Sequence, residues 1–195
     1  MPGGTRSVKR FTAEERRPAV IEAALRAFAR TGYHGTTVAD VAAGSGISQA
    51  YVFRLFGSKD ALFVAALRRC YERVQAAVAA GAEAAPVEQP EVLLEHMGAA
   101  YAELIADQAV LMLQVQALAA TGEPLVQRAV YECQQRLVEF VLDRSKASPA
   151  AVQIFFARGQ LCHLVTALRL IGNSERWATT LSNGIRHPHS SEGVP

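Results

Sequence analysis

The fold of this chain is decided by residues 37–62, which read TVADVAAGSGISQAYVFRLFGSKDAL. A short helix can begin after Thr36 or Thr37, because threonine is a favoured N-terminal cap, and the glycines of Gly44-Ser45-Gly46 would end it. A second short helix can begin after Ser48 and continues with apolar residues at helical spacing. Two short helices joined by a tight turn that contains glycine indicate a helix-turn-helix, whose second helix lies in the major groove of DNA.

The first turn of that second helix is the candidate surface for reading bases. Gln49 can pair with an adenine edge, Tyr51 can touch a base or a phosphate, and Arg54 can reach the backbone or a guanine. Free amides at the helix starts near Thr37 and Lys59 can hold phosphates through the helix dipole. The predicted DNA-binding residues are Thr37, Ser48, Gln49, Ala50, Tyr51, Phe53, Arg54 and Lys59. Periodicity alone is explained equally well by an ordinary helical hairpin.

Charge is divided unevenly along the chain, whose net charge is +2. Residues 1–80 carry twelve Lys or Arg against six Asp or Glu, giving +6, whereas residues 81–195 carry eight against twelve, giving −4. A basic first part favours contact with a polyanion, although a solvated surface can have the same composition. The N-terminal arm, with Arg6, Lys9 and Arg10, is either a disordered basic tail or a contact to the DNA backbone or minor groove.

Helical spacing extends through the rest of the chain, and no stretch alternates as a strand would. Residues 1–80 hold four expected helices: one that follows a capping box of Thr12 and Glu15 and ends at Gly32, the two short ones, and a connecting helix over about 59–80. The expected helices beyond the linker each carry an apolar stripe, and they cover Pro90 to about Asp107, a segment to Ala120, Pro124 to near Ser145, Pro149 to Ile171, and Glu175 to Leu181.

The predicted fold class is therefore all-α, with an N-terminal helix-turn-helix domain of three helices and a fourth helix that connects it to a C-terminal helical bundle. We expect the two domains to cover residues 1–80 and 81–195, because an alanine-rich run meets the Pro86 to Pro90 linker at this point. The tail from about residue 185 is expected to be disordered.

Residues 37–62 resemble the signature of the tetracycline-repressor (TetR) family of bacterial regulators. Phe56, Ser58, Lys59 and Leu62 match the ending F-x-S-K-x-x-L of that signature. In the first expected helix and just after it, Ala24, Phe28, Gly32 and Thr36-Thr37 match the part of the family pattern that precedes this signature. The resemblance covers about the first 65 residues. It implies a dimer whose two reading helices enter successive major grooves, and a helical second domain that binds a small molecule and forms the dimer.

Two positions depart from the family pattern. Phe53 stands where the family usually has a tyrosine that contacts phosphate, and Leu55 stands where histidine or tyrosine is frequent. Each substitution removes a polar tip. The phosphate contacts would then fall to Tyr51, Arg54, Lys59 and the N-terminal arginines, while the ring of Phe53 can still pack on sugar or on a thymine methyl.

The second domain is expected to hold a cavity for a small apolar or aromatic effector. Adaptable apolar side chains mixed with a few polar ones suit such a ligand. The residues nominated for it are Met97, Tyr101, Met112, Gln116 and Tyr131. The alternative is that these side chains only form core.

A dimer seam is expected on the last helices. The helix from Pro149 to Ile171 is apolar around more of its circumference than one core contact can cover, so part of it would be buried against a partner. The residues nominated for the dimer interface are Phe155, Phe156, Leu161, Leu164, Leu168 and Trp177. Trp177 either anchors this seam or covers the core of its own monomer.

Several other classes of protein do not fit the sequence. The three cysteines, Cys70, Cys133 and Cys162, stand far apart, which argues against a disulfide framework or a zinc site and favours the cytoplasm. No uncharged stretch of about 18 residues is available to cross a membrane, and the N-terminus has no apolar core of a secretion signal. His96 and His163 lack ligand partners at metal-binding spacing, so no metal or cofactor is expected.

No catalytic motif is present, so we do not expect an enzyme. The sequence predicts a cytoplasmic, homodimeric TetR-like transcriptional regulator, a repressor, that binds double-stranded operator DNA and leaves it when a small molecule fills the second domain. The alternative is a helical small-molecule-binding or interaction protein that no longer reads DNA, given Phe53 and Leu55.

Overall fold

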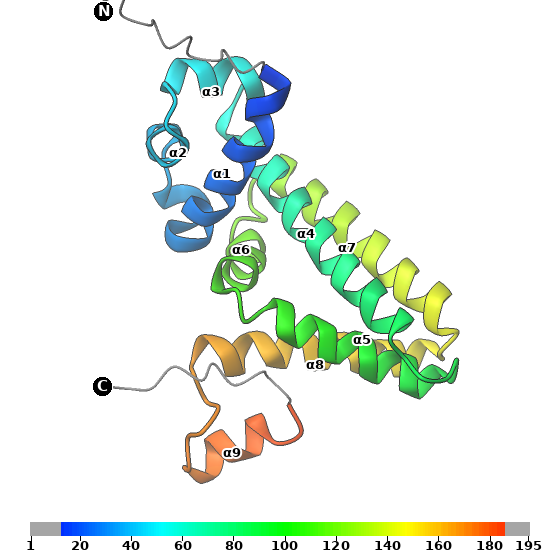
Figure 1. Cartoon of the computed structure of the whole chain (residues 1–195). Coiled ribbons are helices and arrows are strands. Elements are labelled where there is room, and N and C mark those ends of the chain that lie inside the picture. The colour runs from blue at the N-terminus through cyan, green and yellow to red at the C-terminus, as the bar shows by residue number, and fades with distance from the viewer. Residues whose placement is uncertain (1–12, 186–195) are drawn as a thin grey trace, which may run out of the picture.

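The computed structural model describes residues 13–185, and within that range the chain forms helices and no strand. The helices, shown in Figure 1, are α1 (Ala13–Gly35), α2 (Val38–Ser45), α3 (Gln49–Phe56), α4 (Lys59–Glu83), α5 (Pro90–Leu104), α6 (Gln108–Ala119), α7 (Pro124–Ser145), α8 (Pro149–Ala167) and α9 (Arg176–Ser182). The all-α prediction is confirmed. None of these helices is apolar over a length that would span a bilayer.

The first three helices form the end of the molecule that holds the helix-turn-helix. Thr37 caps α2 in a capping box with Asp40, and Gly46 ends that helix in the left-handed conformation, with φ at 67°. Ser48 then caps α3 by accepting a hydrogen bond from the Tyr51 amide. Val41 is fully buried beneath the turn. The sequence prediction of two short helices and a glycine turn within residues 37–56 is confirmed.

The long helix α4 joins this end to the rest of the molecule. Its first turns pack on α1, where the Phe28 and Phe63 rings meet edge to face with centroids 4.8 Å apart. Farther along, α4 packs against both α5 and α7, and α8 lies behind α5 in the view of Figure 1. Gly81 is required here, because a Cβ at this position would lie 2.5 Å from the His96 carbonyl oxygen of α5.

Several predicted helix ends differ from the observed ones. α1 continues past Gly32 to Gly35, but Gly32 itself breaks the helix with φ 71° and ψ 178°. The connecting helix α4 runs to Glu83, and α5 stops at Leu104. The predicted capping box at Thr12 lies outside the described residues, as do the basic arm and most of the tail predicted to be disordered.

The predicted end of α8 at Ile171 is wrong by four residues. Arg169 takes the left-handed conformation, with φ at 53°, and the Leu170 amide donates to the Val165 carbonyl at 2.9 Å. Leu170 is buried against Val165, which completes a Schellman ending. Glycine usually occupies the left-handed position of this motif. Gly172 therefore led the sequence analysis to expect the end of α8 at Ile171.

Candidate nucleic-acid interface and adjoining cavity

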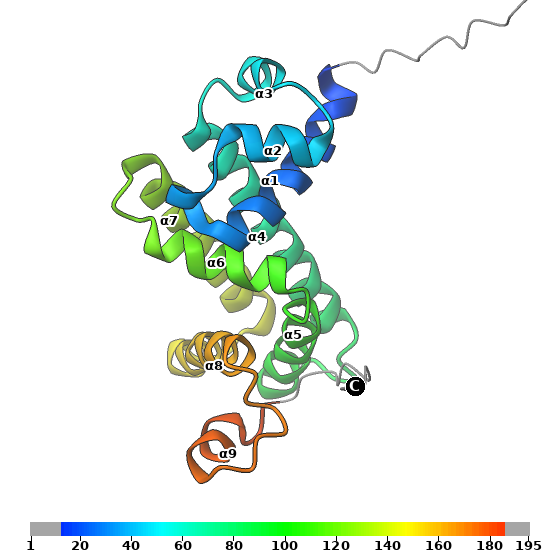
Figure 2. The same cartoon turned by 90° about the vertical axis from the view of Figure 1, so that its left-hand side faces the viewer.

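The helix α3 lies at one extreme of the molecule and presents one side to solvent (Figure 2). Val52 and Phe56 on its inner side are buried, and they fix its orientation against α1 and α2. The outer side exposes Gln49, Ala50 and Arg54, with the Ser48 cap beside them. A rigid helix with free polar side chains at its first turns is suited to the major groove.

Two side chains on this outer surface are held together. The Arg54 guanidinium lies over the Tyr51 ring, 4.4 Å from its centroid, while Tyr51 is half-buried. A cation stacked on an aromatic face keeps its hydrogen-bond donors free at its edges. Phe53, where the family has tyrosine, is 42% exposed and presents an apolar ring to solvent.

The end of α3 is clamped by a residue that the sequence analysis missed. Arg17 of α1 donates from Nη1 to the Leu55 carbonyl oxygen at 2.7 Å, and its guanidinium lies 4.3 Å from the centroid of the Phe56 ring. The contact joins positions 38 residues apart. No local pattern marks Arg17, so only the folded structure reveals this role.

Lys59 lies against α1 instead of extending freely. Its ammonium is 4.7 Å from the centroid of the Tyr33 ring and 3.5 Å from the His34 carbonyl oxygen. The Tyr33 hydroxyl donates to Asp60, and burial together with this carboxylate raises the pKa of Tyr33 to about 12. The start of α4 is thereby tied to the end of α1.

The amides at the starts of α2 and α4 are less free than expected. Thr37 donates its backbone amide to Asp40 at 2.7 Å, and the Asp40 amide donates to the Thr37 hydroxyl. The Thr37 hydroxyl also donates to the Asp40 carboxylate, and this bond together with the one from the Thr37 amide lowers the pKa of Asp40, which keeps a negative charge at this helix start. At α4, the Ala61 amide donates to Ser58 at 3.1 Å. The prediction of free amides near Thr37 and Lys59 is therefore corrected for these groups.

A cavity of about 550 Å³ lies in the second half of the molecule, between α4, α5, α7 and α8. Val74 and Val78 of α4 form one wall, and Phe155 and Phe156 of α8 form another. Polar groups enter from Tyr101, Gln114 and Gln134.

The comparisons with known proteins agree with this geometry. Residues 20–66 match the family model described as bacterial regulatory proteins, tetR family. Over 54 residues, or 28% of this chain, the sequence is 37% identical to the HTH-type transcriptional regulator RutR of Escherichia coli K12. The match spans only 26% of RutR, so the chain shares about a quarter of that relative's length. The first part of the chain, over residues 20–66, is similar to the tetR family of bacterial regulatory proteins.

Solved structures share the fold of this chain along most of its length. A TetR-like regulator from Rhodococcus sp. RHA1 has a TM-score of 0.64 at 22% identity, covering 88% of this chain and 94% of that one. A TetR-family regulator from Agrobacterium tumefaciens has a TM-score of 0.66 at 17% identity, covering 88% and 94%. The multidrug binding protein EbrR, complexed with imidazole, has a TM-score of 0.63 at 23% identity, covering 91% and 99%.

The cavity includes one of the five residues nominated for the effector, Tyr101. Met97 is fully buried in the core, and Met112 packs against the core from its edge. Gln116 of α6 packs against α1, where its Oε1 is 2.6 Å from the position that a Cβ of Gly32 would take. Tyr131 is 68% exposed, because it follows the buried Val130 and so lies off the inward stripe of α7.

The nominated dimer residues divide into two groups. Three of them are exposed: Leu164 of α8 by 45%, Leu168 at the end of that helix by 54%, and Trp177 of α9 by 50%. Ile154 of α8, which was not nominated, is 55% exposed. Phe155 and Phe156 instead pack against the core and line the cavity. Leu161 is half-buried and packs against the small cluster around Val165.

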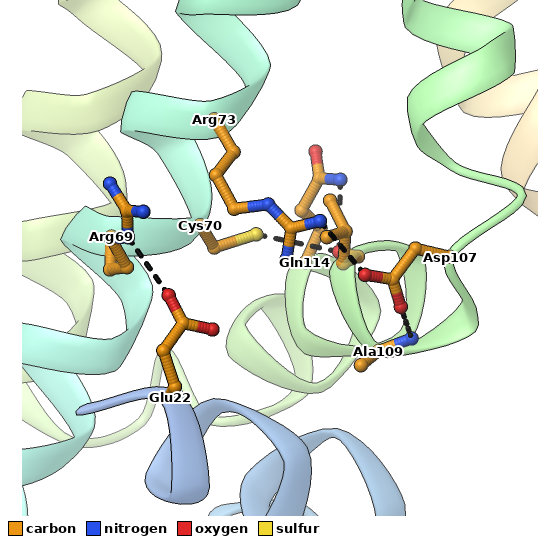
Figure 3. A network of polar contacts seen from close by, with 8 residues as sticks. Glu22, Arg69, Cys70, Arg73, Asp107, Ala109 and Gln114 are labelled. Carbon is orange, nitrogen blue, oxygen red and sulfur yellow. Dashed lines mark hydrogen bonds and ion pairs between the residues drawn. The ribbon is translucent and has the colours of Figure 1, made fainter. Parts of the chain in front are cut away.

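Polar contacts join α6, which carries the cavity residue Gln114, to α4, and α4 to α1 (Figure 3). Tyr101 hydrogen bonds to Gln114 and to His163, and Gln114 donates to the Val110 carbonyl at 3.1 Å. The Cys70 thiol of α4 donates to the same carbonyl at 3.4 Å.

Ion pairs continue these contacts toward α1. Arg73 of α4 pairs at 2.9 Å with Asp107, which caps α6 through the Ala109 amide (Figure 3). Arg69 of α4 pairs at 3.0 Å with Glu22 of α1. The sequence analysis did not identify these partners, because they lie on helices far apart along the chain.

Proposed function

We propose that this protein is a ligand-responsive transcriptional repressor that binds an inverted-repeat operator as a homodimer, in the cytoplasm where the DNA lies. The observation that carries the proposal is the surface of α3, where Gln49, Ala50 and Arg54 face solvent while Val52 and Phe56 anchor the opposite side. A reading helix needs this combination, because base contacts require a rigid scaffold behind free polar side chains.

In this proposal each exposed side chain has a separate task on DNA. The Gln49 amide pairs with an adenine edge, and the Arg54 guanidinium, stacked on Tyr51, reaches a guanine or a phosphate. Phe53 places its exposed ring against a thymine methyl or a sugar. Ser48, Ala50, Thr37 and Lys59 border this surface and set how closely the backbone approaches the duplex.

We place the effector in the cavity between α4, α5, α7 and α8. Its size lies within the range of small-molecule sites, and its lining is largely apolar and aromatic. The fold relative EbrR was solved with imidazole, a small aromatic molecule, which supports an effector of this kind. Such an effector releases the operator only to the extent that it prefers a conformation that binds DNA poorly.

Two helices connect this cavity to the reading helix. Val74 and Val78 of α4 line the cavity, while Lys59 at the start of the same helix holds Tyr33 of α1. On α6, Gln114 lines the cavity and Gln116 rests on Gly32. The ion pairs along this path are partly exposed, so we expect packing to transmit more of the coupling than charge does.

The homodimer in this proposal is formed by α8 and α9. Ile154, Leu164, Leu168 and Trp177 are about half exposed, although they are large and apolar. Covering them with the same surface of a second copy would form an isologous interface. Two reading helices could then meet half-sites about 34–36 Å apart, one turn of DNA.

The test is a footprint of the purified protein on the DNA that flanks its own gene, with wild type and two variants. We expect protection of an inverted repeat by the wild type and loss of that protection in Gln49→Ala and Tyr51→Ala, with unchanged circular dichroism. Gln75→Ala, at an exposed position of α4, is the matched control and should protect the same DNA. If both reading-helix variants protect the repeat as the wild type does, base reading by these residues is wrong.

A protein that no longer reads DNA is the second candidate, and the exposed apolar ring of Phe53 favours it. In that case Phe53→Tyr, which restores the hydroxyl usual in the family, would create DNA binding that the wild type lacks. Tight binding by the wild type with no gain in Phe53→Tyr would remove this candidate.

A further inference from the structure

Two glycines in the cavity wall stand where the helices do not require them. Gly98 lies within α5 and Gly159 within α8, and glycine in a helix interior is less stable than alanine. A Cβ on Gly98 would lie 3.6 Å from the Phe155 ring, and one on Gly159 would lie 3.8 Å from the Tyr101 ring. Both distances are ordinary van der Waals contacts, so alanine would fit at either position.

Gly81 provides the contrast. There a Cβ would come within 2.5 Å of the His96 carbonyl oxygen, so the close approach of α4 and α5 demands glycine. Packing makes no such demand at Gly98 and Gly159. At these two positions the cavity wall has no side chain beside two aromatic rings, Phe155 and Tyr101, which line the same cavity.

Of the residues that the structure describes, those that line the inner part of the cavity carry no charge. Its charged lining residues, Glu91, Glu95 and Arg158, are all exposed, so they belong to the rim. The polar groups farther in are neutral amides and hydroxyls of Tyr101, Gln114 and Gln134.

These inner polar groups already have hydrogen-bond partners within the protein. Tyr101 bonds to Gln114 and to His163, and Gln134 donates to the Tyr71 hydroxyl at 2.8 Å. Burial lowers the pKa of His163, which keeps its imidazole uncharged. Among the described residues, no buried side-chain nitrogen or oxygen lacks a partner. An ionised ligand group would therefore lose its hydration here and find no opposite charge in exchange.

We propose that the cavity selects an uncharged, flat aromatic molecule, whose ring occupies the space beside Gly98 and Gly159 and whose polar group faces the Tyr101 hydroxyl. The ligand proposal rests on the proposed function only where it identifies that molecule as the effector. The two glycines act as specificity-determining residues, because a larger side chain at either position would extend into the cavity beside Phe155 or Tyr101.

The test compares two fluorescent probes with the same ring system, using the full-length protein without DNA. N-phenyl-1-naphthylamine is uncharged, whereas 1-anilinonaphthalene-8-sulfonate carries one negative charge. We expect saturable binding of the uncharged probe and binding of the sulfonate that is weaker by about tenfold or more. Equal binding of the two probes would overturn the requirement for an uncharged ligand.

The glycines are tested by filling the space. Gly98→Leu and Gly159→Leu should weaken binding of N-phenyl-1-naphthylamine by about tenfold or more, since leucine would occupy the volume of the ring. Gly122→Leu is the matched control, because a Cβ there meets no atom within 4 Å, and it should bind the probe as the wild type does. Undiminished binding in both folded cavity variants would overturn the proposal.

A second readout covers the case in which a leucine variant does not fold. Cys162 lines the cavity, whereas Cys70 and Cys133 are buried in the core. Bound N-phenyl-1-naphthylamine should slow alkylation of Cys162 in the wild type, and alkylation at an unchanged rate would place the probe elsewhere. Because DNA is absent throughout, failure of the operator footprint and failure of these titrations can be told apart.

Discussion

At the residue scale, the positions of the side chains on α3 could be predicted from sequence because they depend on near neighbours. Ser48 caps α3, so Gln49 and Ala50 must lie in its first turn. Arg54 is two residues from both Val52 and Phe56, which are buried, so it lies on the opposite, exposed side of the helix. Cavity residues depend instead on how α4, α5, α7 and α8 meet. The sequence could not show which methionine or tyrosine faces that space.

Arg17 is expected to matter for DNA binding although it is not on the reading helix. Arg17→Gln removes the hydrogen bond to the Leu55 carbonyl and the contact with the Phe56 ring, so the end of α3 loosens. We expect weaker binding to every DNA sequence by roughly three- to tenfold, and a change in thermal stability that is small for an exposed side chain.

Fluorescence anisotropy on specific and random duplexes measures this effect. Arg26→Gln, an exposed arginine of α1, is the control for the lost charge. Equal affinities of Arg17→Gln and wild type would show that the clamp has no role in holding α3.

His163 makes the stability of the second domain sensitive to acid. Burial lowers its pKa in the folded protein below the ordinary 6.5, so the unfolded chain binds a proton first as the pH falls. This contribution to stability is fully present above about pH 6.5 and is lost between 6.5 and the lowered pKa, at a slope approaching about 1 kcal/mol per pH unit.

Urea unfolding between pH 5 and 7.5 checks the prediction. His163→Gln, which cannot take up the proton, should have a flatter pH profile than the wild type in this range. Parallel profiles for the two proteins would contradict the assignment to His163.

At the scale of the elements, the sequence predicted every helix that the structure describes, because apolar spacing and caps are local. The short helices from Thr37 to Phe56 and the start of α8 after Ser148 match the sequence signals. The ends that were misplaced depend on other contacts. α8 stops at Ala167 because Leu170 turns back onto Val165, a tertiary contact for which Arg169 adopts a conformation usual for glycine.

The break in α1 at Gly32 is a second element-scale feature, and we expect Gly32→Ala to be destabilising by about 1–3 kcal/mol. With φ 71° and ψ 178° the backbone lies in a region that only glycine adopts readily, and a Cβ would also meet Gln116 Oε1 at 2.6 Å. The same change loosens the contact between α1 and α6.

Chemical unfolding measures the loss, with Gly122→Ala as the control. That position has open space around it and should show little change. Gly32→Ala as stable as the wild type would contradict the account of the kink.

At the scale of the whole molecule, the exposed apolar side chains of α8 and α9 set the expected assembly. Leu164→Glu combined with Leu168→Glu places charges on a surface that we expect to be buried between two copies. The variant should be monomeric in sedimentation, and its operator affinity should fall by about a hundredfold because the two reading helices are no longer linked.

Leu125→Glu is the matched control, since Leu125 is similarly exposed but lies at the start of α7. It should remain dimeric. A double variant that stays dimeric would move the interface to another surface.

The division of the molecule into two parts is a second feature at the scale of the whole molecule. Residues 1–80 carry an excess of six positive charges and hold the reading helix, whereas residues 81–195 carry four net negative charges and hold most of the cavity. We propose that the DNA-binding unit ends within α4, which runs on to Glu83 and contributes Val74 and Val78 to the cavity. Charge and the linker indicated this division from sequence. The shared role of α4 required the structure.

The central claim is that α3 reads DNA sequence in a dimer, and selection of binding sites from a random duplex library tests it most directly. The selection is run at two salt concentrations, because phosphate contacts make affinity salt-dependent. We predict that the wild type enriches an inverted repeat and that Gln49→Ala loses preference at one base pair of each half-site. No enriched sequence at either salt, or the same repeat with undiminished preference in Gln49→Ala and Tyr51→Ala, would contradict the account.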